Sequence, residues 1–392
     1  MPAPSSMSLF EHPMLGRGFR PFFLLAASYS AVSLLGWTGY NAGLWGQPGS
    51  FVDPVLWHAH EMIYGFVLAV VAGFLLTAVA NWTGGAPVRQ LHLMGLCLLW
   101  IAGRITMNVN GLPLWLTAVA DNLFIPALAV SLSLPLLKAK NTRNFIFLGL
   151  LTALFSCNVA FFIMQDRLPL HVAVLVIIAM ISLVGGRIIP AFTVAGLRRT
   201  GLVVYQQDQS KLDILCLLSM AGVAASFVLA GAASPVTGLA AVAAAVLHLA
   251  RFRHYHTLKV FKDPMLWILH AGYAWLVLGL LMLGLAGFGL GMLTVALHAL
   301  TTGCIGSMCI GMMCRVTLGH TGRHLLARPM TVLMFGIMQL AAILRVLGPV
   351  VLPGYYIFWI AASGILWALC FALYLPVYAP MLVKPRPDGL PA

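Results

Sequence analysis

Twelve long apolar runs constrain this 392-residue chain more than any other feature, because a bilayer core requires about 20 apolar residues per helix. Hydrophobic residues make up 61% of the chain and charged residues 8%, which excludes a water-soluble globular domain. The runs lie near residues 22–44, 56–80, 92–111, 116–137, 145–164, 169–190, 212–232, 236–252, 265–286, 289–313, 330–351 and 355–380. We therefore predict an all-α, polytopic membrane protein of twelve helices, folded as a single transmembrane domain over residues 1–392.

The basic residues indicate topology. If the helices alternate in direction, every lysine and arginine except Arg104, Arg167, Arg187 and Arg345 falls on one side of the membrane. The positive-inside rule makes that side the cytoplasm and places both termini there. The net charge of +13 therefore predicts orientation among membrane lipids and does not indicate a nucleic-acid partner.

Helices two, six and ten share a pattern that suggests an internal repeat. Each begins with a histidine and ends with a threonine 22 or 23 residues later, close to a glycine; the histidines are His60, His171 and His298. We predict three tandem units of four helices, over residues 17–143, 144–262 and 263–384, arranged with pseudo-threefold symmetry. The alternative explanation of this similarity is that any two apolar helices resemble one another.

Ionisable residues at membrane depth form two groups. Such residues are costly in a bilayer, so they tend to face the protein interior and to mark function. The group toward the outer side consists of His58, His60, Glu61, Arg104, Asp121, His171, His298 and Arg345. The group toward the cytoplasm consists of Arg187, His248, His270, Arg315, His320 and His324.

The outer histidines are candidate metal ligands. Neutral imidazole binds haem iron and copper, and helix bundles hold such centres with histidines from separate helices. His60 and His298 are the first choice for haem, and the metal candidates are His58, His60, His171 and His298. His270 is a further cofactor-binding candidate, although a single intramembrane histidine ordinarily bonds a backbone carbonyl. No CxxCH motif occurs, so we expect non-covalent haem b.

Three charged residues complete the predicted site. Glu61 lies three residues after His58, on the same helix face, and is a candidate proton carrier or partner of that imidazole. Arg104 and Arg345 are candidates for binding haem propionates through bidentate contacts. Glu61 and Asp121 are the acids that could pair with these arginines instead.

Four motifs resemble those of the NnrS family. They are GRGFRPFF (16–23), WHAHEM (57–62), GRIIPAF (186–192) and MCRVTLGHTGR (313–323), and the resemblance covers essentially the whole chain. It implies a multi-pass protein of the bacterial inner membrane that contains haem and copper and is associated with the response to nitric oxide and nitrosative stress.

The chain is also distantly similar to the catalytic subunits of haem-copper oxidases and nitric oxide reductases. Those subunits have twelve core helices and functional histidines on helices two, six and ten, where this sequence has His60 (or His58), His171 and His298. Helix six here reads LHVAVLV where that superfamily has a His-Pro-Glu type motif, and helix seven has no histidine pair. The similarity thus supports a metal centre without its standard copper site.

Together these features favour a haem- and copper-binding membrane protein that binds, detoxifies or senses nitric oxide. The candidate enzymatic activity is a haem-copper type oxidoreductase reaction with an unknown electron donor. Two other hypotheses stay open. One is a secondary transporter, because twelve helices with cytoplasmic ends is also a common transporter plan. The other is a factor that delivers haem or copper.

Overall fold

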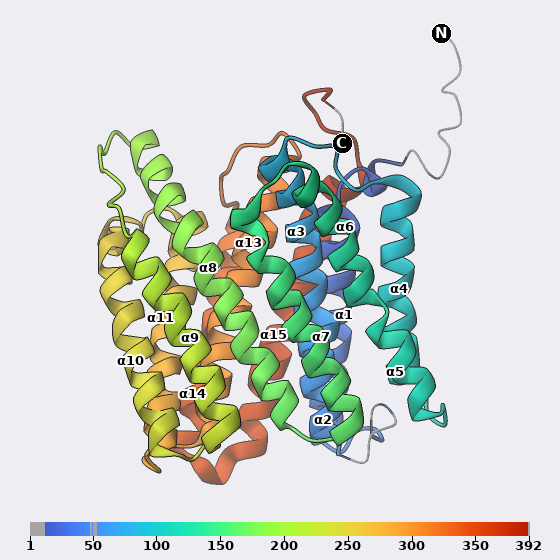
Figure 1. Cartoon of the computed structure of the whole chain (residues 1–392), viewed down its shortest axis with the longest axis vertical. Helices are drawn as coiled ribbons and strands as arrows, with labels where there is room; N and C mark the ends of the chain where they lie inside the picture. Colours follow the sequence, from blue (N-terminus) through green and yellow to red (C-terminus); the bar gives the residue numbers. More distant parts are fainter. Residues whose placement is uncertain (1–11, 48, 50–52, 391–392) are drawn as a thin grey trace. The chain divides into compact units, whose positions relative to one another are not determined.

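A computed structural model describes residues 12–47, 49 and 53–390, which are mostly helical and contain no strand (Figure 1). Within these residues, twelve helices are long and apolar enough to cross a membrane. The all-α prediction and the twelve expected helices are therefore confirmed. The arrangement as three tandem units stays a prediction, as does the single domain.

Contacts between helices divide the chain into two compact units. Unit 1 comprises Met1–Arg167, Met313–Leu325 and Phe371–Ala392. Unit 2 comprises Leu168–Met312 and Leu326–Cys370.

Unit 1 contains a continuous series of helical segments. They are α1 (Phe19–Asn41), α2 (Pro54–His60), the π-helical η3 (Glu61–Val67), α3 (Leu68–Thr83), α4 (Gln90–Asn108), α5 (Leu114–Asn122), α6 (Phe124–Lys138) and α7 (Ile146–Met164). Single 3-10 turns precede α1 and α7, as η2 (Pro13–Leu15) and η4 (Thr142–Asn144).

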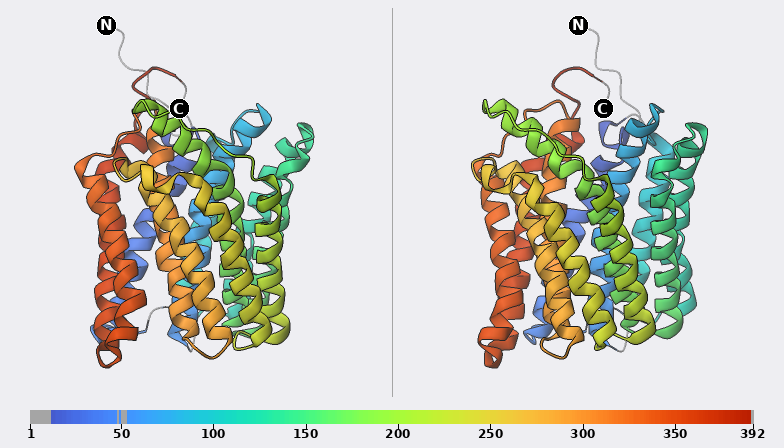
Figure 2. Two further views of the ribbon diagram at one scale, coloured as in Figure 1. Left: turned by 90° about the vertical axis from the view of Figure 1, so that its left-hand side faces the viewer. Right: turned by 60° about the vertical axis from the view of Figure 1, so that its left-hand side comes forward.

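Unit 2 also consists of helical segments. Its segments are α8 (Leu168–Arg199), α9 (Ser210–Ala230), α10 (Pro235–Phe252), α11 (Pro264–Gly287), α12 (Leu293–His298), the π-helical η7 (Ala299–Ile305) and α14 (Pro329–Val351). The 3-10 turns η5 (Arg253–Tyr255), η6 (Thr257–Lys259) and η8 (Pro353–Tyr355) join them. Figures 1 and 2 show α9, α10 and α11 side by side, in agreement with their contacts. Two helices, α13 (Gly306–His320) and α15 (Tyr356–Val383), each contribute residues to both units.

Three of the helices begin with the same N-cap motif. The side chains of Asp53, Ser234 and Asp263 each accept a hydrogen bond from the backbone N–H two residues later, and proline follows each of them. Such a side chain satisfies one unpaired donor of the first turn, and proline fits that turn because its N–H is not needed there. These short motifs set where α2, α10 and α11 start.

The structure corrects several predicted helix ends. The predicted run 169–190 continues as helix to Arg199, beyond its predicted end. Arg20, expected in a cytoplasmic segment, lies within α1 and is fully buried. Its Nη1 donates to the carbonyl oxygens of Leu382 and Lys384, both at 2.9 Å. A buried cation that bonds backbone oxygens has a structural role, which hydropathy and charge counting do not reveal.

Two π-helical segments occur at corresponding places in helices two and ten. Glu61–Val67 follows His60 directly, and Ala299–Ile305 follows His298 directly. π-Helical turns are rare and are frequent at functional sites. The shared local backbone is compatible with the repeat without establishing it, and it draws attention to the side chains beside each segment.

Candidate functional site

A buried network of polar and ionisable side chains surrounds the start of η3 in unit 1. We call it the Arg104 network; its members are Tyr29, His60, Glu61, Arg104, Asn108, Asp121 and Asn158. They come from α1, α2, η3, α4, α5 and α7. His60 and Glu61 expose none of their surface and Arg104 exposes 6%. The network therefore brings four sequence-predicted residues, His60, Glu61, Arg104 and Asp121, into contact.

Both ring nitrogens of His60 face acceptor oxygens. Nδ1 lies 2.9 Å from Oε1 of Glu61. Nε2 lies 3.0 Å from Oδ1 of Asn158 and 3.2 Å from Oδ2 of Asp121. The Asn158 amide is oriented by its Nδ2, which donates to the same Asp121 oxygen at 2.6 Å. Because only a donor can face those two oxygens, Nε2 of His60 carries a hydrogen.

The Arg104 guanidinium lies between two carboxylates. Its Nη2 pairs with Oδ1 of Asp121, and its Nη1 lies 3.4 Å from Oε1 of Glu61. It also lies 5.9 Å from the ring centroid of Tyr29 and 5.7 Å from that of Trp100, within cation–π range. The Tyr29 hydroxyl donates to the other oxygen of Glu61. Protein carboxylates thus balance the charge of Arg104. The sequence had offered them as the alternative to haem propionates.

The charges of this network balance only with one additional proton. Arg104 and Asp121 form a neutral pair, which leaves Glu61 and His60. A buried, unpaired carboxylate is costly. The hydrogen bond between Nδ1 of His60 and Oε1 of Glu61 supplies the balance, because it must contain one hydrogen, carried by either residue. The arrangement can therefore hold one proton, shared between an imidazole and a carboxyl group.

Two glycines allow these side chains to approach. A Cβ on Gly65 would lie 2.6 Å from Cε1 of Tyr29 and 2.9 Å from Nη1 of Arg104. A Cβ on Gly103 would lie 2.9 Å from Oδ1 of Asp121. Real side chains do not approach so closely, so the absence of a Cβ at each position makes room for the ion pairs.

A second buried network lies in unit 2. We call it the Arg251 network; its members are Ser182, Asp213, His248, Arg251 and Tyr273, from α8, α9, α10 and α11. Nη1 of Arg251 donates to Oδ1 of Asp213 at 3.0 Å, and Nη2 donates to Oγ of Ser182 at 2.9 Å. Nε of Arg251 donates to the Tyr273 hydroxyl at 2.8 Å. Nδ1 of His248 donates to a backbone carbonyl, so its Nε2 accepts from the Ser182 hydroxyl at 2.8 Å.

The four histidines predicted to bind metal fall in pairs, His58 and His60 in unit 1, His171 and His298 in unit 2. The ring of His58 stacks on that of Trp37, with centroids 4.5 Å apart and planes 8° apart. Their assembly into one centre stays a prediction.

The histidines of unit 2 differ in their hydrogen bonds. Nδ1 of His298 donates to the carbonyl of Thr294 at 2.6 Å, which orients the imidazole ring. A metal-binding histidine commonly has this arrangement. In contrast, the two nitrogens of His270 contact the hydroxyls of Thr193 at 2.9 Å and Thr257 at 3.0 Å.

The remaining predicted residues are placed by ring contacts. His171 packs edge-on against Phe227, with centroids 6.0 Å apart. The Arg345 guanidinium lies 5.9 Å from the ring centroid of Tyr356. Cofactor binding by His171 and Arg345 stays a prediction.

Haem and copper fit some of these residues and not others. Ligation by His60 or His270 would require each to give up a hydrogen bond, since both nitrogens are engaged. The hydrogen bond from Nδ1 of His298 to a backbone carbonyl is of the kind that orients a metal-binding imidazole. Across the described part of the chain, no group of three or more His, Cys, Asp or Glu side chains is placed to hold a metal ion. The copper ligands therefore stay a prediction.

Sequence reasoning missed several members of both networks. Asn158 is not among the predicted residues, although its amide is the most polar side chain of the run 145–164 and was a usable signal. Arg251 was assigned to a cytoplasmic segment, yet it exposes 1% of its surface inside unit 2. Asp213, Ser182 and Tyr273 gave no pattern that separates them from surface or packing residues.

The twelve spans and the enclosed ion pairs define a polytopic helical membrane protein that holds ionisable groups at membrane depth. The family model described as NnrS protein matches residues 13–386, and the chain belongs to the NnrS family. This membership suggests a membrane protein of the nitric oxide response. No curated protein matches the chain.

Proposed function

We propose that this protein binds nitric oxide, and thereby detoxifies or senses it, in the bacterial inner membrane during nitrosative stress. The family match over residues 13–386 carries the proposal. Nitric oxide is apolar and dissolves in lipid, so a site buried among membrane helices is accessible to it without a polar channel. The distribution of basic residues supports cytoplasmic termini.

The proposal includes non-covalent haem b and copper. The observation that favours an imidazole ligand is the hydrogen bond from Nδ1 of His298 to the carbonyl of Thr294, which orients the ring. His58 and His171 stay as metal candidates. Bound haem would supply an iron that takes nitric oxide as a ligand. The Arg104 network would hold charge and one proton in unit 1.

The test is an optical spectrum with a metal count on protein purified from haem-replete cells. We expect a b-type spectrum, complete extraction of the haem by acid-acetone, and a shift of the Soret band on adding nitric oxide. His298→Ala should lose haem, whereas His60→Gln should retain it. The control His254→Ala changes a histidine next to Arg253 in an interhelical turn and should retain haem too. A colourless, metal-free wild-type preparation would contradict the proposal.

A secondary transporter is the second candidate, and the enclosed Arg104 network favours it. Buried pairs of acids with histidine and arginine often line ion or proton paths in transporters. A transporter would lack haem and would discharge a pH gradient across vesicle membranes when its substrate is added. Glu61→Gln should then stop this proton movement.

A haem or copper delivery factor would bind the same metals but exchange them quickly, which a chelator competition would reveal.

A further inference from the structure

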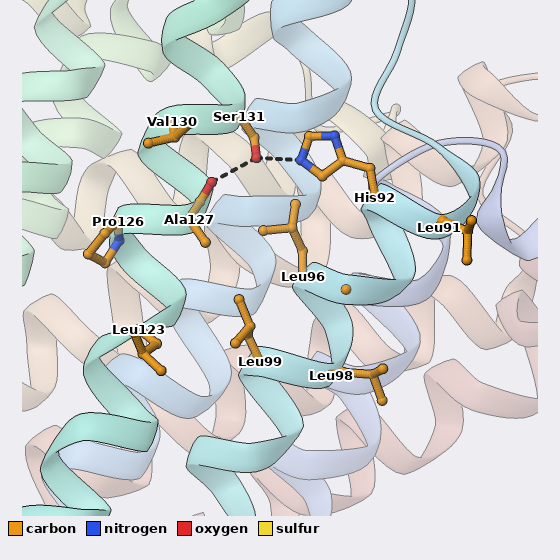
Figure 3. Close-up of a pocket in the computed structure, with 11 residues that line it drawn as sticks. Leu91, His92, Leu96, Leu98, Leu99, Leu123, Pro126, Ala127, Val130 and Ser131 are labelled. Carbon is orange, nitrogen blue, oxygen red and sulfur yellow. Dashed lines mark hydrogen bonds between the residues drawn. The ribbon is translucent and has the colours of Figure 1, made fainter.

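Buried polar atoms without partners indicate a binding site more clearly than an open apolar surface does. The groove between α4 and α6 in unit 1 is lined mainly by leucines, and its polar pair, His92 and Ser131, is joined by a hydrogen bond of 2.8 Å (Figure 3). Such a surface accommodates ordinary membrane lipid and selects no particular occupant. The start of α1, in the same unit, differs because its buried polar atoms lack partners.

Arg20, in the first turn of α1, exposes none of its surface and has more donors than acceptors around it. Its Nη1 donates to the carbonyl oxygens of Leu382 and Lys384, both at 2.9 Å. Its Nε and Nη2 have no hydrogen-bond partner among the described residues, and the same is true of Nε of Arg17. Backbone carbonyls thus anchor one nitrogen of Arg20, while other buried guanidinium donors still require acceptors.

Further positive charges surround Arg20. Arg17, Arg323 and Arg386 all lie close enough to repel its charge. Nη1 of Arg386 donates to the carbonyl of His320 at 3.3 Å, and the ring of His320 packs against the start of α1. Burial and repulsion from Arg386 lower the pKa of Arg17. We call these four arginines the Arg20 cluster, and all four belong to unit 1.

The described acids do not balance this cluster. Asp388 pairs with Arg386 through two hydrogen bonds. No described acid pairs with Arg17 or Arg20, so the charges of these two arginines stay uncompensated. The N-terminus of α1 is the positive end of a helix dipole and has no acidic residue in its first turn. The helix dipole therefore adds to the need for an anion.

A phosphate group fits this set of donors. Guanidinium groups bind oxyanions through parallel hydrogen bonds and offer nothing to a cation. A carboxylate has one charge and two oxygens, whereas a phosphate monoester has about two charges at neutral pH and three acceptor oxygens. We propose that the Arg20 cluster binds a phosphate group, either free in solution or on a lipid headgroup. This inference goes beyond the nitric oxide proposal and does not depend on it.

The exposed carboxylate of Asp388 competes with phosphate for Arg386. Asp388 lies against Gly322, where a Cβ would come within 2.7 Å of its Cγ. Gly322 has a φ of +70°, a conformation that favours glycine, so the backbone leaves room for this carboxylate. Arg20 is enclosed, whereas Arg17 and Arg386 are partly exposed. The phosphate therefore reaches the cluster at these two arginines and displaces Asp388 from Arg386.

The experiment is equilibrium dialysis of the purified full-length protein, in neutral detergent and chloride of fixed ionic strength, against radiolabelled inorganic phosphate. We expect saturable binding. Arg17→Gln should weaken it about tenfold, the effect of one hydrogen bond to a charged group, and acetate should compete about tenfold less well than unlabelled phosphate. The control Arg89→Gln changes an exposed arginine of the same unit and should leave binding unchanged.

Asp388→Asn gives a result that misfolding cannot imitate. The amide keeps the shape of the carboxylate without its charge, so it no longer competes for Arg386. Phosphate should then bind about threefold more tightly, the contribution of an exposed ion pair. Arg20→Met should abolish binding. If Arg20→Met does not fold, Arg17→Gln and Asp388→Asn still test the site in opposite directions.

Dihexanoylphosphatidylglycerol, a soluble lipid that contains a phosphate group, distinguishes the two sources. Displacement of radiolabelled phosphate at lower concentrations of this lipid than of unlabelled phosphate would assign the site to a lipid headgroup. Displacement only at higher concentrations would assign it to free phosphate. Both results support a phosphate site in the Arg20 cluster, provided that Arg17→Gln weakens the binding.

Three results would overturn the proposal. The first is the absence of saturable phosphate binding by both the wild type and Glu11→Gln. The second is equal binding by the wild type, Arg17→Gln and Asp388→Asn, which would place the phosphate elsewhere. The third is binding by Glu11→Gln but not by the wild type. It would identify the carboxylate of Glu11, which lies outside the described residues, as the natural occupant.

Discussion

The two buried arginine networks use similar parts. In each, a guanidinium contacts a carboxylate and the ring of a tyrosine, and a histidine lies beside the ion pair. In each, a glycine also lies against the guanidinium. A Cβ would come within 2.9 Å of Arg104 at Gly65 and within 2.6 Å of Arg251 at Gly186. Both units thus solve the same problem, a charge buried at membrane depth, with a paired acid and a close helix contact.

The networks differ in charge and in enclosure. The Asp213 side chain exposes 40% of its surface, whereas that of Asp121 exposes 3%. The Arg251 network has one carboxylate and a histidine that makes neutral hydrogen bonds, so it is balanced as it stands. The Arg104 network has a second carboxylate, Glu61, and needs one more proton. This difference indicates a structural role for the Arg251 network and a chemical role for the Arg104 network.

The largest expected effect comes from removing each guanidinium. Arg104→Leu leaves two enclosed carboxylates, and we expect a loss of about 3–5 kcal/mol in the free energy of unfolding. Arg251→Leu leaves an Asp213 that water can reach, so the loss should be smaller, about 1.5–3 kcal/mol for hydrogen bonds from a charged group. Reversible unfolding in mixed micelles measures both.

A double variant sharpens this comparison. In Arg104→Leu/Asp121→Leu the unpaired charge of Asp121 is removed, and apolar replacement of a buried pair is often close to neutral. It should therefore be more stable than Arg104→Leu alone. Equal losses in Arg104→Leu and Arg251→Leu would show that enclosure does not distinguish the networks.

The second comparison concerns the glycines. Gly65→Ala places a methyl group 2.6 Å from the rigid ring of Tyr29, and we expect a loss of about 1–3 kcal/mol from overpacking. Gly186→Ala meets the end of the Arg251 side chain and the partly exposed Asp213, which can both shift. The same unfolding measurement should show a smaller loss for Gly186→Ala. A larger loss for Gly186→Ala would contradict the tighter enclosure of the Arg104 network.

The fold could be predicted from the sequence because its main cause is local. An apolar run long enough to span a bilayer has little choice but to form a helix, since every backbone group must be paired within it. Helix ends were predicted less well, as in the continuation of α8 to Arg199. Hydropathy detects the residue at which a helix enters polar surroundings. The backbone hydrogen bonds of the helix can continue beyond that residue.

The site could be predicted only in part. His60, Glu61 and Arg104 were recognisable because charges in apolar helices are costly, and Asp121 was recognised only as one of two acids that could pair with Arg104 or Arg345. Their mutual geometry was not, because it depends on Gly65, Gly103 and the π-helical turn at Glu61–Val67, which set distances between helices. The engagement of both nitrogens of His60 also depends on Asn158 from α7. Composition and spacing within one helix contain no information about such contacts.

A third comparison uses the neutral side chains that bridge each network. Asn158→Ala removes hydrogen bonds to Asp121 and His60, and bonds to charged groups contribute about 1.5–3 kcal/mol. Ser182→Ala removes a hydroxyl from the Arg251 network but leaves the bond from Arg251 to the Ser182 carbonyl. It also leaves Nε2 of the buried His248 without its donor, so its loss should be about 1–3 kcal/mol, no larger than that of Asn158→Ala because Arg251 keeps its other partners. If Ser182→Ala costs more in unfolding experiments, the Arg251 network depends on its side-chain bridge more than its geometry indicates.

The smallest expected effect comes from an exposed ion pair at the end of unit 1. Arg386 donates from Nε to Oδ1 of Asp388 at 2.9 Å and from Nη2 to Oδ2 at 2.6 Å. This hydrogen bonding lowers the pKa of Asp388 to about 2. Since the folded-state pKa lies below the usual value of about 3.9, the pair stabilises the fold above that pH and loses its effect as the pH falls toward 2.

The variant Asp388→Asn removes this exposed ion pair and serves as a reference for the enclosed ion pairs of Arg104. Water and salt screen exposed charges, so the change in melting temperature at neutral pH should be small and should vanish at high salt. The loss caused by Arg104→Leu should persist at high salt, because ions do not enter the enclosed network. A salt dependence as strong for Arg104→Leu as for Asp388→Asn would mean that water reaches Asp121 and Glu61. The distinction between an enclosed and an open network would then have to be abandoned.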